Sequence, residues 1–455
     1  MSGNSKRADG PVPAPRQFGA WYPWYAVIVL TLAATISAID RQVLALMIGP
    51  VKRDLQISDT QMGLLLGAAF ATLHTLASFP MARLADRYSR KWIIAGGIFC
   101  WSLLTAASAL AHRYSTLFLA RMGVGVSEAS LPPAAYSMMS DYFSQKQLPL
   151  AVGIFQSATF FGVGFASFVG GPLIQHLEMQ PALVVPIVGD MYPWQAAFLV
   201  VGLPGVLVAV LAAGLREPAR TGRVVEVRQS VPIADIVRFA RARWVLLSLH
   251  FGGFFLMALQ GYSLFAWGAE YFIRAHEMSR AQAGVSFGLV AMIFGILGSF
   301  SGGAIATWLM ARGYRDGPMR LAALKCVIVT PFAVAFGLMG EAWSAVAAMV
   351  PLTFLMALTP GLGAAVMQTI APNEMRGQMV AVYLTFVNFF ALLLAPLIVA
   401  LLTEFVFRSE GALGYSLSVL AAMAYPTAAV LLWLALKPYR QALEAAAGFG
   451  ITRRA

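Results

Sequence analysis

Apolar segments of roughly 20 residues or more recur along the whole chain, and a helix that crosses a bilayer requires such a length. We place them at residues 24–48, 60–82, 91–111, 116–139, 147–172, 193–214, 244–270, 281–311, 320–340, 343–369, 376–402 and 413–436. The pattern predicts an all-α membrane protein with twelve transmembrane helices.

The composition excludes most other classes of protein. Hydrophobic residues make up 59% of the chain and charged residues 11%, whereas about a quarter of a soluble domain is charged. A soluble enzyme, a disordered chain and a coiled coil are therefore excluded. The two cysteines, Cys100 and Cys326, both lie in apolar runs and form no metal or disulfide pattern. We expect no metal and no cofactor.

One long polar segment divides the twelve spans into two groups of six. It runs from 216 to 243 and carries seven arginines. We expect an N-terminal six-helix bundle at 1–217, a cytoplasmic basic linker at 218–243 and a C-terminal six-helix bundle at 244–455.

The two halves also share a weak repeat. A short basic turn precedes the fifth span at 141–147 and the eleventh at 372–377. Parallel repeats of this kind are typical of transporters with a site between the halves. The predicted architecture is two pseudo-symmetric six-helix bundles.

The 32 lysines and arginines divide unevenly between the two sides of the predicted membrane. With the N-terminus inside, 24 lie on the cytoplasmic side, six lie outside, and two fall within spans. Positive residues favour the cytoplasmic side, so we expect both termini in the cytoplasm. This distribution accounts for the net charge of +12 without a nucleic-acid partner. No cleavable signal is visible, and the first apolar segment is expected to remain a span.

The first and fourth predicted spans contain four charged residues, each of which costs about 2.5–3.5 kcal/mol near the membrane centre. They are Asp40 and Arg41 in the first span and Arg121 and Glu128 in the fourth. Arg121 and Glu128 are seven residues apart, which places them two helical turns apart on one face. The four side chains are expected to meet near the midplane.

Two interpretations of this cluster remain open. The charges could be structural ion pairs that tie the two helices together. Alternatively, Asp40 and Glu128 couple transport to protons, and Arg41 and Arg121 hold an anionic substrate group through their planar forks. A change in the distance between Asp40 and an arginine would then load and release a proton.

Other polar residues in the spans could contact a substrate. The candidates for substrate binding are Gln156, Tyr262, Tyr383 and Asn388, with Gln260 and Gln368 as further possibilities. Each could equally form a hydrogen bond between helices. His74 is interpreted as a packing residue.

The turn between the second and third spans is basic and contains one acid. Arg83, Asp86, Arg87 and Arg90 occur there at turn spacing, so a gating role is predicted besides that of a solvated cytoplasmic loop. The arginines would bridge to neighbouring helices and form a latch that holds the cytoplasmic side closed.

This turn, from Ala82 to Lys91, resembles the signature turn of the major facilitator superfamily, with Ala82 and Ser89 in place of two glycines. The segment from Arg121 to Gly125 is similar to the motif of that superfamily's fourth span. The resemblance covers the whole chain and implies the superfamily's twelve-helix fold.

A closer resemblance, over residues 35–160, is to the spinster family. It rests on Ile39-Asp40-Arg41, on the run Gly63-Leu64-Leu65 and above all on the segment 121–130, in which Ser127 replaces a glycine of the family. It implies a bacterial inner-membrane carrier of lysolipids or sphingoid phosphates, with sugars also proposed. Asp40 is implied as the proton-linked acid, with Arg41, Arg121 and Glu128 as site residues.

We therefore expect a monomeric, proton-coupled carrier that moves a lysolipid or sphingoid-type amphiphile by alternating access, with membrane lipids, protons and the amphiphile as partners. A carrier of small organic anions, sugars or drug-like compounds is the alternative. A membrane enzyme is disfavoured because no acid stands at catalytic spacing from any of the five histidines within a span. A receptor or channel would leave the buried acids and the latch without a purpose.

Overall fold

The computed structural model describes residues 19, 21–144, 147–180, 183–185, 189–220, 232–359, 361–372 and 375–451. Within these residues, eleven helical segments are long and apolar enough to cross a membrane. They are α1 (Tyr22–Leu46), α3 (Asp59–Leu66) with α4 (Ala68–Arg87), α5 (Arg90–Ala107) with η1 (Ser108–Leu110), α8 (Leu148–Glu178), α9 (Pro193–Ala213), α11 (Trp244–His276), α12 (Arg280–Ala311), α13 (Gly317–Phe336), α14 (Ala342–Ala357) with α15 (Leu362–Ile370), α16 (Arg376–Leu401) with η2 (Leu402–Phe407), and η3 (Glu410–Ala412) with α17 (Leu413–Ile451).

The twelfth span is the predicted fourth one, and it is divided into two helices. α6 (Tyr114–Glu128) and α7 (Leu131–Tyr142) meet at Ala129 and Ser130. Two prolines, Pro132 and Pro133, begin α7. Proline has no N–H and is tolerated in the first turn of a helix but not in its interior, so the continuous helix is interrupted here. The prediction of twelve transmembrane helices is confirmed.

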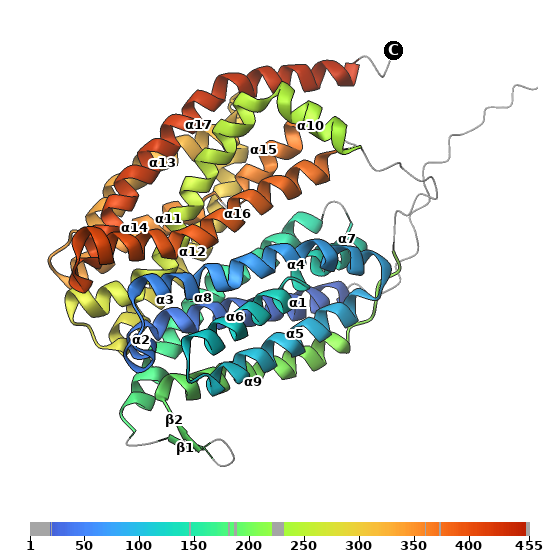
Figure 1. Ribbon diagram of the computed structural model, residues 1–455. Coiled ribbons are helices and arrows are strands. Elements are labelled where there is room, and N and C mark those ends of the chain that lie inside the picture. The colour runs from blue at the N-terminus through green and yellow to red at the C-terminus, as the bar shows by residue number, and fades with distance from the viewer. Residues whose placement is uncertain are drawn as a thin grey trace, which may run out of the picture.

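Three further elements lie outside these spans. α2 (Ile48–Leu55) follows α1, a hairpin of β1 (Leu183–Val185) and β2 (Gly189–Met191) follows α8, and α10 (Ile233–Ala242) precedes α11. We call the end of the molecule that carries α2 and the β-hairpin the hairpin end, and the opposite end, where α1 begins and α17 finishes, the termini end (Figure 1).

The helices form two groups in the order of the chain. Figure 1 shows α1–α9 in one group and α10–α17 in the other. The predicted boundaries at 217 and 243 remain predictions, because residues 221–231 of the linker lie outside the described residues.

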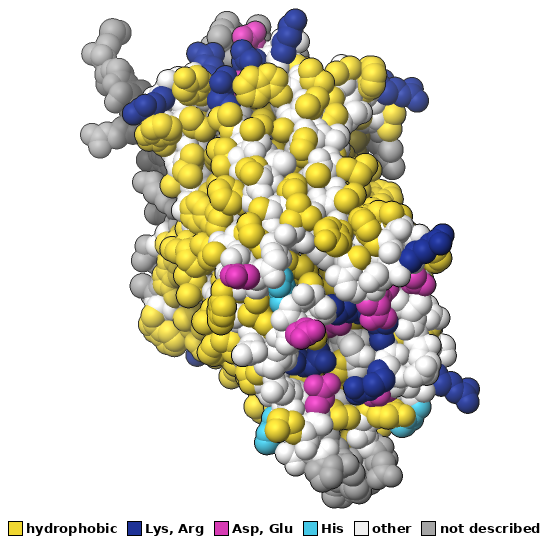
Figure 2. All heavy atoms as spheres, turned by 90° about the vertical axis from the view of Figure 1, so that its left-hand side faces the viewer, with side chains coloured by type: hydrophobic (Ala, Val, Ile, Leu, Met, Phe, Trp, Pro, Cys, Tyr) yellow, Lys and Arg dark blue, Asp and Glu magenta, His cyan; other side chains and the backbone are white. Residues whose placement is uncertain are grey.

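The surface of the helices carries the apolar side chains that a bilayer requires. Figure 2 shows a broad hydrophobic surface above a region in which acidic, basic and histidine side chains gather. Large side chains such as Leu207 and Trp433 are 70% and 55% exposed. Exposed apolar area on this scale indicates lipid contact. The chain is a multi-pass membrane protein.

One residue of the charge count is misplaced by the sequence prediction. Lys325 was counted on the cytoplasmic side, but it lies within α13 and is 1% exposed. Its Nζ atom is 3.6 Å from Sδ of Met257 on α11 and 5.1 Å from the ring centre of Tyr425 on α17. The predicted span 320–340 already includes this lysine. The charge count should therefore have assigned Lys325 to the span and not to the loop.

The two groups of helices approach each other most closely toward the hairpin end. A Cβ atom on Gly67 of α3–α4 would lie 2.7 Å from the carbonyl oxygen of Leu392 on α16. A Cβ atom on Gly284 of α12 would lie 2.6 Å from the carbonyl oxygen of Ser167 on α8. Only glycine permits such an approach between backbones, so these crossings hold the halves together at that end.

Candidate functional site

The first part of the candidate site is a polar cluster between α1 and α6. Arg41 of α1 forms an ion pair with Glu128 at the end of α6. Ser37 lies one turn before Arg41 and donates a hydrogen bond of 2.6 Å to Oε2 of Glu128. Arg41 in turn donates to the Ser37 hydroxyl at 2.9 Å. The spacing of four residues on α1 thus presents both side chains to the same carboxylate.

The second part of the cluster surrounds Asp40. Thr105 of α5 donates to Oδ2 of Asp40 at 3.1 Å, and Arg121 donates to the backbone oxygen of Asp40 at 3.3 Å. Asp40, Arg121 and Glu128 are all buried, with at most 2% of their surface exposed. The structure therefore brings the four predicted charged residues together, with Ser37 and Thr105 as additional partners.

The cluster is only partly satisfied. Among the described atoms, Oδ1 of Asp40, Nε and Nη1 of Arg121, and Oε1 of Glu128 have no hydrogen-bond partner. A buried polar atom without a partner costs about 1–3 kcal/mol. A carboxylate of Asp40 or Glu128 could therefore still bind a proton, and the guanidinium of Arg121 could still donate to a further acceptor.

Arg41 differs from the other three charged residues in its accessibility. Its side chain is 35% exposed, whereas that of its partner Glu128 is 1% exposed. Arg41 also lies over the ring of Phe70 on α4, with Cζ 5.2 Å from the ring centre. A molecule that enters the cluster would therefore meet Arg41 first.

Two of the predicted substrate contacts bond to each other in the C-terminal half, and one of them, Tyr262, lies near this cluster. Tyr262 of α11 donates a hydrogen bond of 3.2 Å to Asn388 of α16, and its hydroxyl is close enough to Arg41 to interact electrostatically. Gln42 of α1 also donates to the backbone oxygen of Phe265 on α11 at 3.2 Å. α1 and α11 are thus in contact beside the cluster.

The remaining predicted contacts lie elsewhere. Gln156 is exposed on α8. Tyr383 of α16 is 3% exposed and packs against His250 of α11, with ring centres 5.0 Å apart. The structure therefore places Tyr383 among the C-terminal helices and does not bring it to the charged cluster.

The residues predicted to form a gate lie at the termini end. Arg90 begins α5, is 1% exposed, and pairs with Asp141 at the end of α7 and with Glu217 after α9. It also donates to the Ser137 hydroxyl at 2.9 Å and to the Pro218 backbone oxygen at 2.9 Å. All of these partners belong to the N-terminal half, so among the described residues Arg90 makes no bond to the C-terminal half.

Glu217 lies outside the membrane spans and is held by several donors. Burial alone would raise its pKa, but hydrogen bonds from Arg90, from the Lys91 backbone N–H and from Ser89 together lower the pKa below the ordinary glutamate value. Ionised Glu217 therefore stabilises this network.

The other predicted gating residues, Arg83, Asp86 and Arg87, are exposed at the end of α4. The cation that spans this turn is instead Arg220, which donates to the backbone oxygens of Ala85 and Tyr88 at 2.9 and 2.7 Å. The gating role of the turn remains a prediction.

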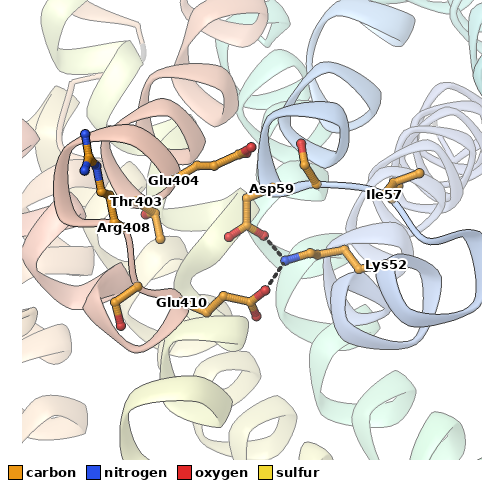
Figure 3. A pocket seen from close by; sticks show the side chains of 9 residues that line it. Lys52, Ile57, Asp59, Thr403, Glu404, Arg408 and Glu410 are labelled. Atoms are coloured by element: carbon orange, nitrogen blue, oxygen red, sulfur yellow. Dashed lines mark hydrogen bonds and ion pairs between the residues drawn. The ribbon is translucent and has the colours of Figure 1, made fainter.

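An ion-pair network that is not predicted from the sequence joins the two halves at the hairpin end. Arg274 of α11 pairs with Asp59 at 2.8 Å and with Glu270 at 2.8 Å. Lys52 of α2 pairs with Asp59 at 2.6 Å and with Glu410 at 2.8 Å (Figure 3). The sequence does contain a signal for this network, because acids and bases occur at the same ends of several spans.

A pocket of about 480 Å³ opens beside this network. Figure 3 shows Lys52, Ile57 and Asp59 on one side of it and Thr403, Glu404, Arg408 and Glu410 on the other. A second contact between the halves, from the Thr60 backbone N–H to Glu404 at 2.8 Å, borders it. The pocket thus lies on the seam that the ion pairs close.

Comparisons with known proteins agree with this arrangement. The model of the Major Facilitator Superfamily matches residues 30–396. An MFS-type efflux pump of Mycolicibacterium smegmatis is 28% identical over 92% of this chain and 94% of its own length. A probable galactarate/D-glucarate transporter of Pseudomonas putida is 26% identical over 80% of this chain and 81% of its own.

A solved structure gives the same result at the level of the fold. The crystal structure of a bacterial homologue of the human lysosomal transporter Spinster, in an inward-facing and unoccupied conformation, aligns with a TM-score of 0.74. It is 25% identical, and the alignment covers 94% of this chain and 98% of the other. The relatives are transporters and not enzymes, and the resemblance to the spinster family is confirmed. The chain belongs to the Major Facilitator Superfamily.

Proposed function

We propose that this transporter is proton-coupled and moves a lysolipid or sphingoid-type amphiphile across a bacterial inner membrane by alternating access. The observation that carries the proposal is the buried, partly satisfied cluster of Asp40, Arg41, Arg121 and Glu128. Such charges are retained in a membrane interior mainly for function.

Asp40 is suited to carry the proton. It is 0% exposed, and its Oδ1 atom has no hydrogen-bond partner among the described atoms. The neighbouring cation Arg121 donates to the Asp40 backbone and leaves Nε and Nη1 free of partners within the described residues. A small movement of α6 against α1 would bring this guanidinium onto the carboxylate and displace a proton.

Arg41 is suited to hold an anionic headgroup. It is the accessible cation of the cluster, and Tyr262 and Asn388 present a hydroxyl and an amide from the opposite half. Leu384, one turn from Asn388 on α16, is 38% exposed. A polar end beside an apolar side chain matches an amphiphile, whose headgroup and acyl chain need adjoining surfaces of these two kinds.

The orientation of the chain follows from the positive-inside rule. With the termini end in the cytoplasm, the closed hairpin end faces outward and the molecule is inward-facing. The similar structure with an inward-facing conformation supports this assignment. The transporter is proposed to act as a monomer, because each chain contains both halves of its site.

The test is transport in proteoliposomes with Asp40→Asn. We expect uptake driven by a pH gradient to be lost, while substrate binding and the unfolding temperature stay close to those of the wild type. Asp235→Asn is the matched control, because Asp235 of α10 pairs only with Arg238 of its own helix among the described residues. Full pH-driven uptake by Asp40→Asn would refute the coupling role.

A small organic anion such as a sugar acid is the second candidate substrate. Two arginines near one site suit a dicarboxylate. The Pseudomonas putida relative is named a probable galactarate/D-glucarate transporter. A thermal-shift screen of lysolipids, sphingoid phosphates, sugars and organic acids on the wild type and on Arg121→Ala separates the candidates. Stabilisation by sugar acids alone, lost in Arg121→Ala, would replace the amphiphile with the sugar acid.

A further inference from the structure

His74 of α4, which is predicted from the sequence to be a packing residue, lies directly beside the charged cluster. Its Nδ1 atom is 3.1 Å from the backbone oxygen of Gly125 on α6. Because a carbonyl oxygen only accepts, Nδ1 must carry the hydrogen. Gly125 lies three residues before Glu128, so this bond fixes His74 to the segment that presents the glutamate.

Phe70 connects His74 to Arg41. It lies one turn before His74 on α4, and the two rings stack with centres 4.9 Å apart and an interplanar angle of 23°. The guanidinium of Arg41 lies over the same phenyl ring, with Cζ 5.2 Å from its centre. The ring of Phe70 therefore contacts both the imidazole and the cation that pairs with Glu128.

The close approach of α4 and α6 depends on Gly125. A Cβ atom at this position would lie 2.6 Å from the backbone oxygen of Phe70 and 3.4 Å from the backbone nitrogen of His74. Any larger residue would push α4 away from α6 and break the hydrogen bond between His74 and Gly125. Three elements thus converge on Phe70: its own helix α4, α6 through His74, and α1 through Arg41.

We propose that His74 is a positioning residue that holds Arg41 against Glu128. The hydrogen bond to Gly125 fixes the imidazole, the imidazole fixes the Phe70 ring by stacking, and the ring face holds the guanidinium through a cation–π interaction. His74 thereby sets the affinity of Arg41 for the anionic headgroup. This inference rests on the proposed function only in its reference to the headgroup.

The experiment is a double-mutant cycle of His74→Ala and Arg41→Ala in proteoliposomes. Lysophosphatidylglycerol is the anionic probe, and monoacylglycerol, which carries no charge, is its neutral counterpart. For the anionic probe we expect His74→Ala to raise KM about fivefold, the size of one cation–π contact, while the maximal rate changes less than about twofold. His74→Phe, which keeps a ring for stacking but loses the hydrogen bond to Gly125, should restore only part of the affinity.

The cycle separates positioning from simple packing. With Arg41→Ala already present, His74→Ala should cause no further rise in KM, because no guanidinium remains to be held. Equal effects in both backgrounds, or an equal loss of rate for both probes, would overturn the proposal. His112→Ala is the matched control, since His112 is exposed in the turn before α6, and it should behave like the wild type.

Thermal unfolding of the same four proteins in detergent gives a second measurement that needs no substrate. The two substitutions should destabilise the protein by less together than the sum of their separate effects, because they remove one shared interaction. If Arg41→Ala leaves transport of the anionic probe unchanged, the proposed headgroup site fails, and this unfolding cycle still decides the role of His74. Additive destabilisation would refute it.

Discussion

The two ends of the molecule use their charges differently. Among the described residues, every ion pair that joins a residue before 221 to a residue after 231 lies at the hairpin end. At the termini end, Arg90 pairs with Asp141 and Glu217 within the N-terminal helices. The hairpin end is therefore closed by bonds between the halves, whereas the termini end is reinforced within one half.

The C-terminal half has its own internal network at the termini end, with the signs of charge exchanged. The buried residue there is an acid, Asp316, which is 2% exposed and receives Arg320 at 3.1 Å and Arg440 at 3.2 Å. Each half thus ties the start of its third span to the end of its sixth. Bonds inside a half persist when the halves rock, whereas bonds between halves belong to one conformation only.

This difference gives the two ends different thermodynamic roles. An interaction present in one conformation shifts the equilibrium between conformations by its full free energy. An interaction present in both conformations stabilises the fold and shifts nothing. Substitutions at the hairpin end should therefore change populations, and substitutions at the termini end should change the free energy of unfolding.

The largest shift is expected for Asp59→Asn. Asp59 is 4% exposed and is shared by Lys52 and Arg274, so its neutral replacement leaves two cations facing each other. Removal of one partner of a buried pair costs about 3–5 kcal/mol. Here that cost destabilises only the conformation in which the hairpin end is closed. Electron spin-resonance distances between labels at positions 53 and 409, both exposed, should acquire a longer population.

Arg90→Ala is the comparison for that experiment. It also breaks a buried network, so the unfolding temperature should fall at least as far as in Asp59→Asn. The distances between labels at 53 and 409 should stay as in the wild type. A longer population in Arg90→Ala would contradict the assignment of the termini-end network to both conformations.

A smaller shift is expected for Gly67→Ala. The added methyl group would lie 2.7 Å from the backbone oxygen of Leu392 and 2.8 Å from that of Leu393, and backbone atoms cannot rotate away. Overpacking of this kind costs about 1–3 kcal/mol, and it again destabilises the conformation in which the hairpin end is closed. The same spin-label distances measure it. Gly96→Ala is the control, because nothing lies within 4 Å of a Cβ there, and a shift in both variants would refute the steric explanation.

The sequence predicts most of the fold because the bilayer imposes one requirement on every span. Runs of apolar residues locate all twelve spans. The break between α6 and α7 is not predicted, although Pro132 and Pro133 mark it in the sequence. The prediction fails at Lys325, where one charge near the start of a span was assigned to the adjacent loop although it is buried against Tyr425.

The candidate site is only partly predictable, since pairing depends on contacts between distant segments. Asp40, Arg41, Arg121 and Glu128 stand out because charges are costly in a membrane. Ser37 and Thr105 give no such signal, as hydroxyl residues are common in spans. The pairing of Asp59 with Arg274, 215 residues away, follows only from the packing of α3 against α16, which in turn packs against α11.

Lowering the pH is expected to have a still smaller effect, on the stability of the network around Glu217 at the termini end. The pKa of Glu217 is lowered in the folded protein, so its stabilisation is complete above the ordinary glutamate pKa of about 4.3 and is lost as the pH falls through the lower folded value. Between about pH 6 and pH 3, the wild type should lose more stability than Glu217→Gln, measured by thermal unfolding.

Glu341→Gln serves as the control for the acid experiment, because Glu341 is exposed before α14 and should leave the pH dependence unchanged. The spin-label distances at the hairpin end should not follow the titration of Glu217. If they did, the termini-end network would differ between conformations after all.

The smallest effect is expected for Glu410→Gln, although Glu410 is part of the hairpin-end network. Its side chain is 67% exposed, and Lys52 keeps Asp59 as a partner when Glu410 is neutral. Exposed pairs contribute about 0–1 kcal/mol and are screened by salt. The distances between labels at 53 and 409 should therefore change slightly at low salt and not at all at high salt. A shift as large as that of Asp59→Asn would mean that the rim of the pocket, and not the buried carboxylate, holds the halves together.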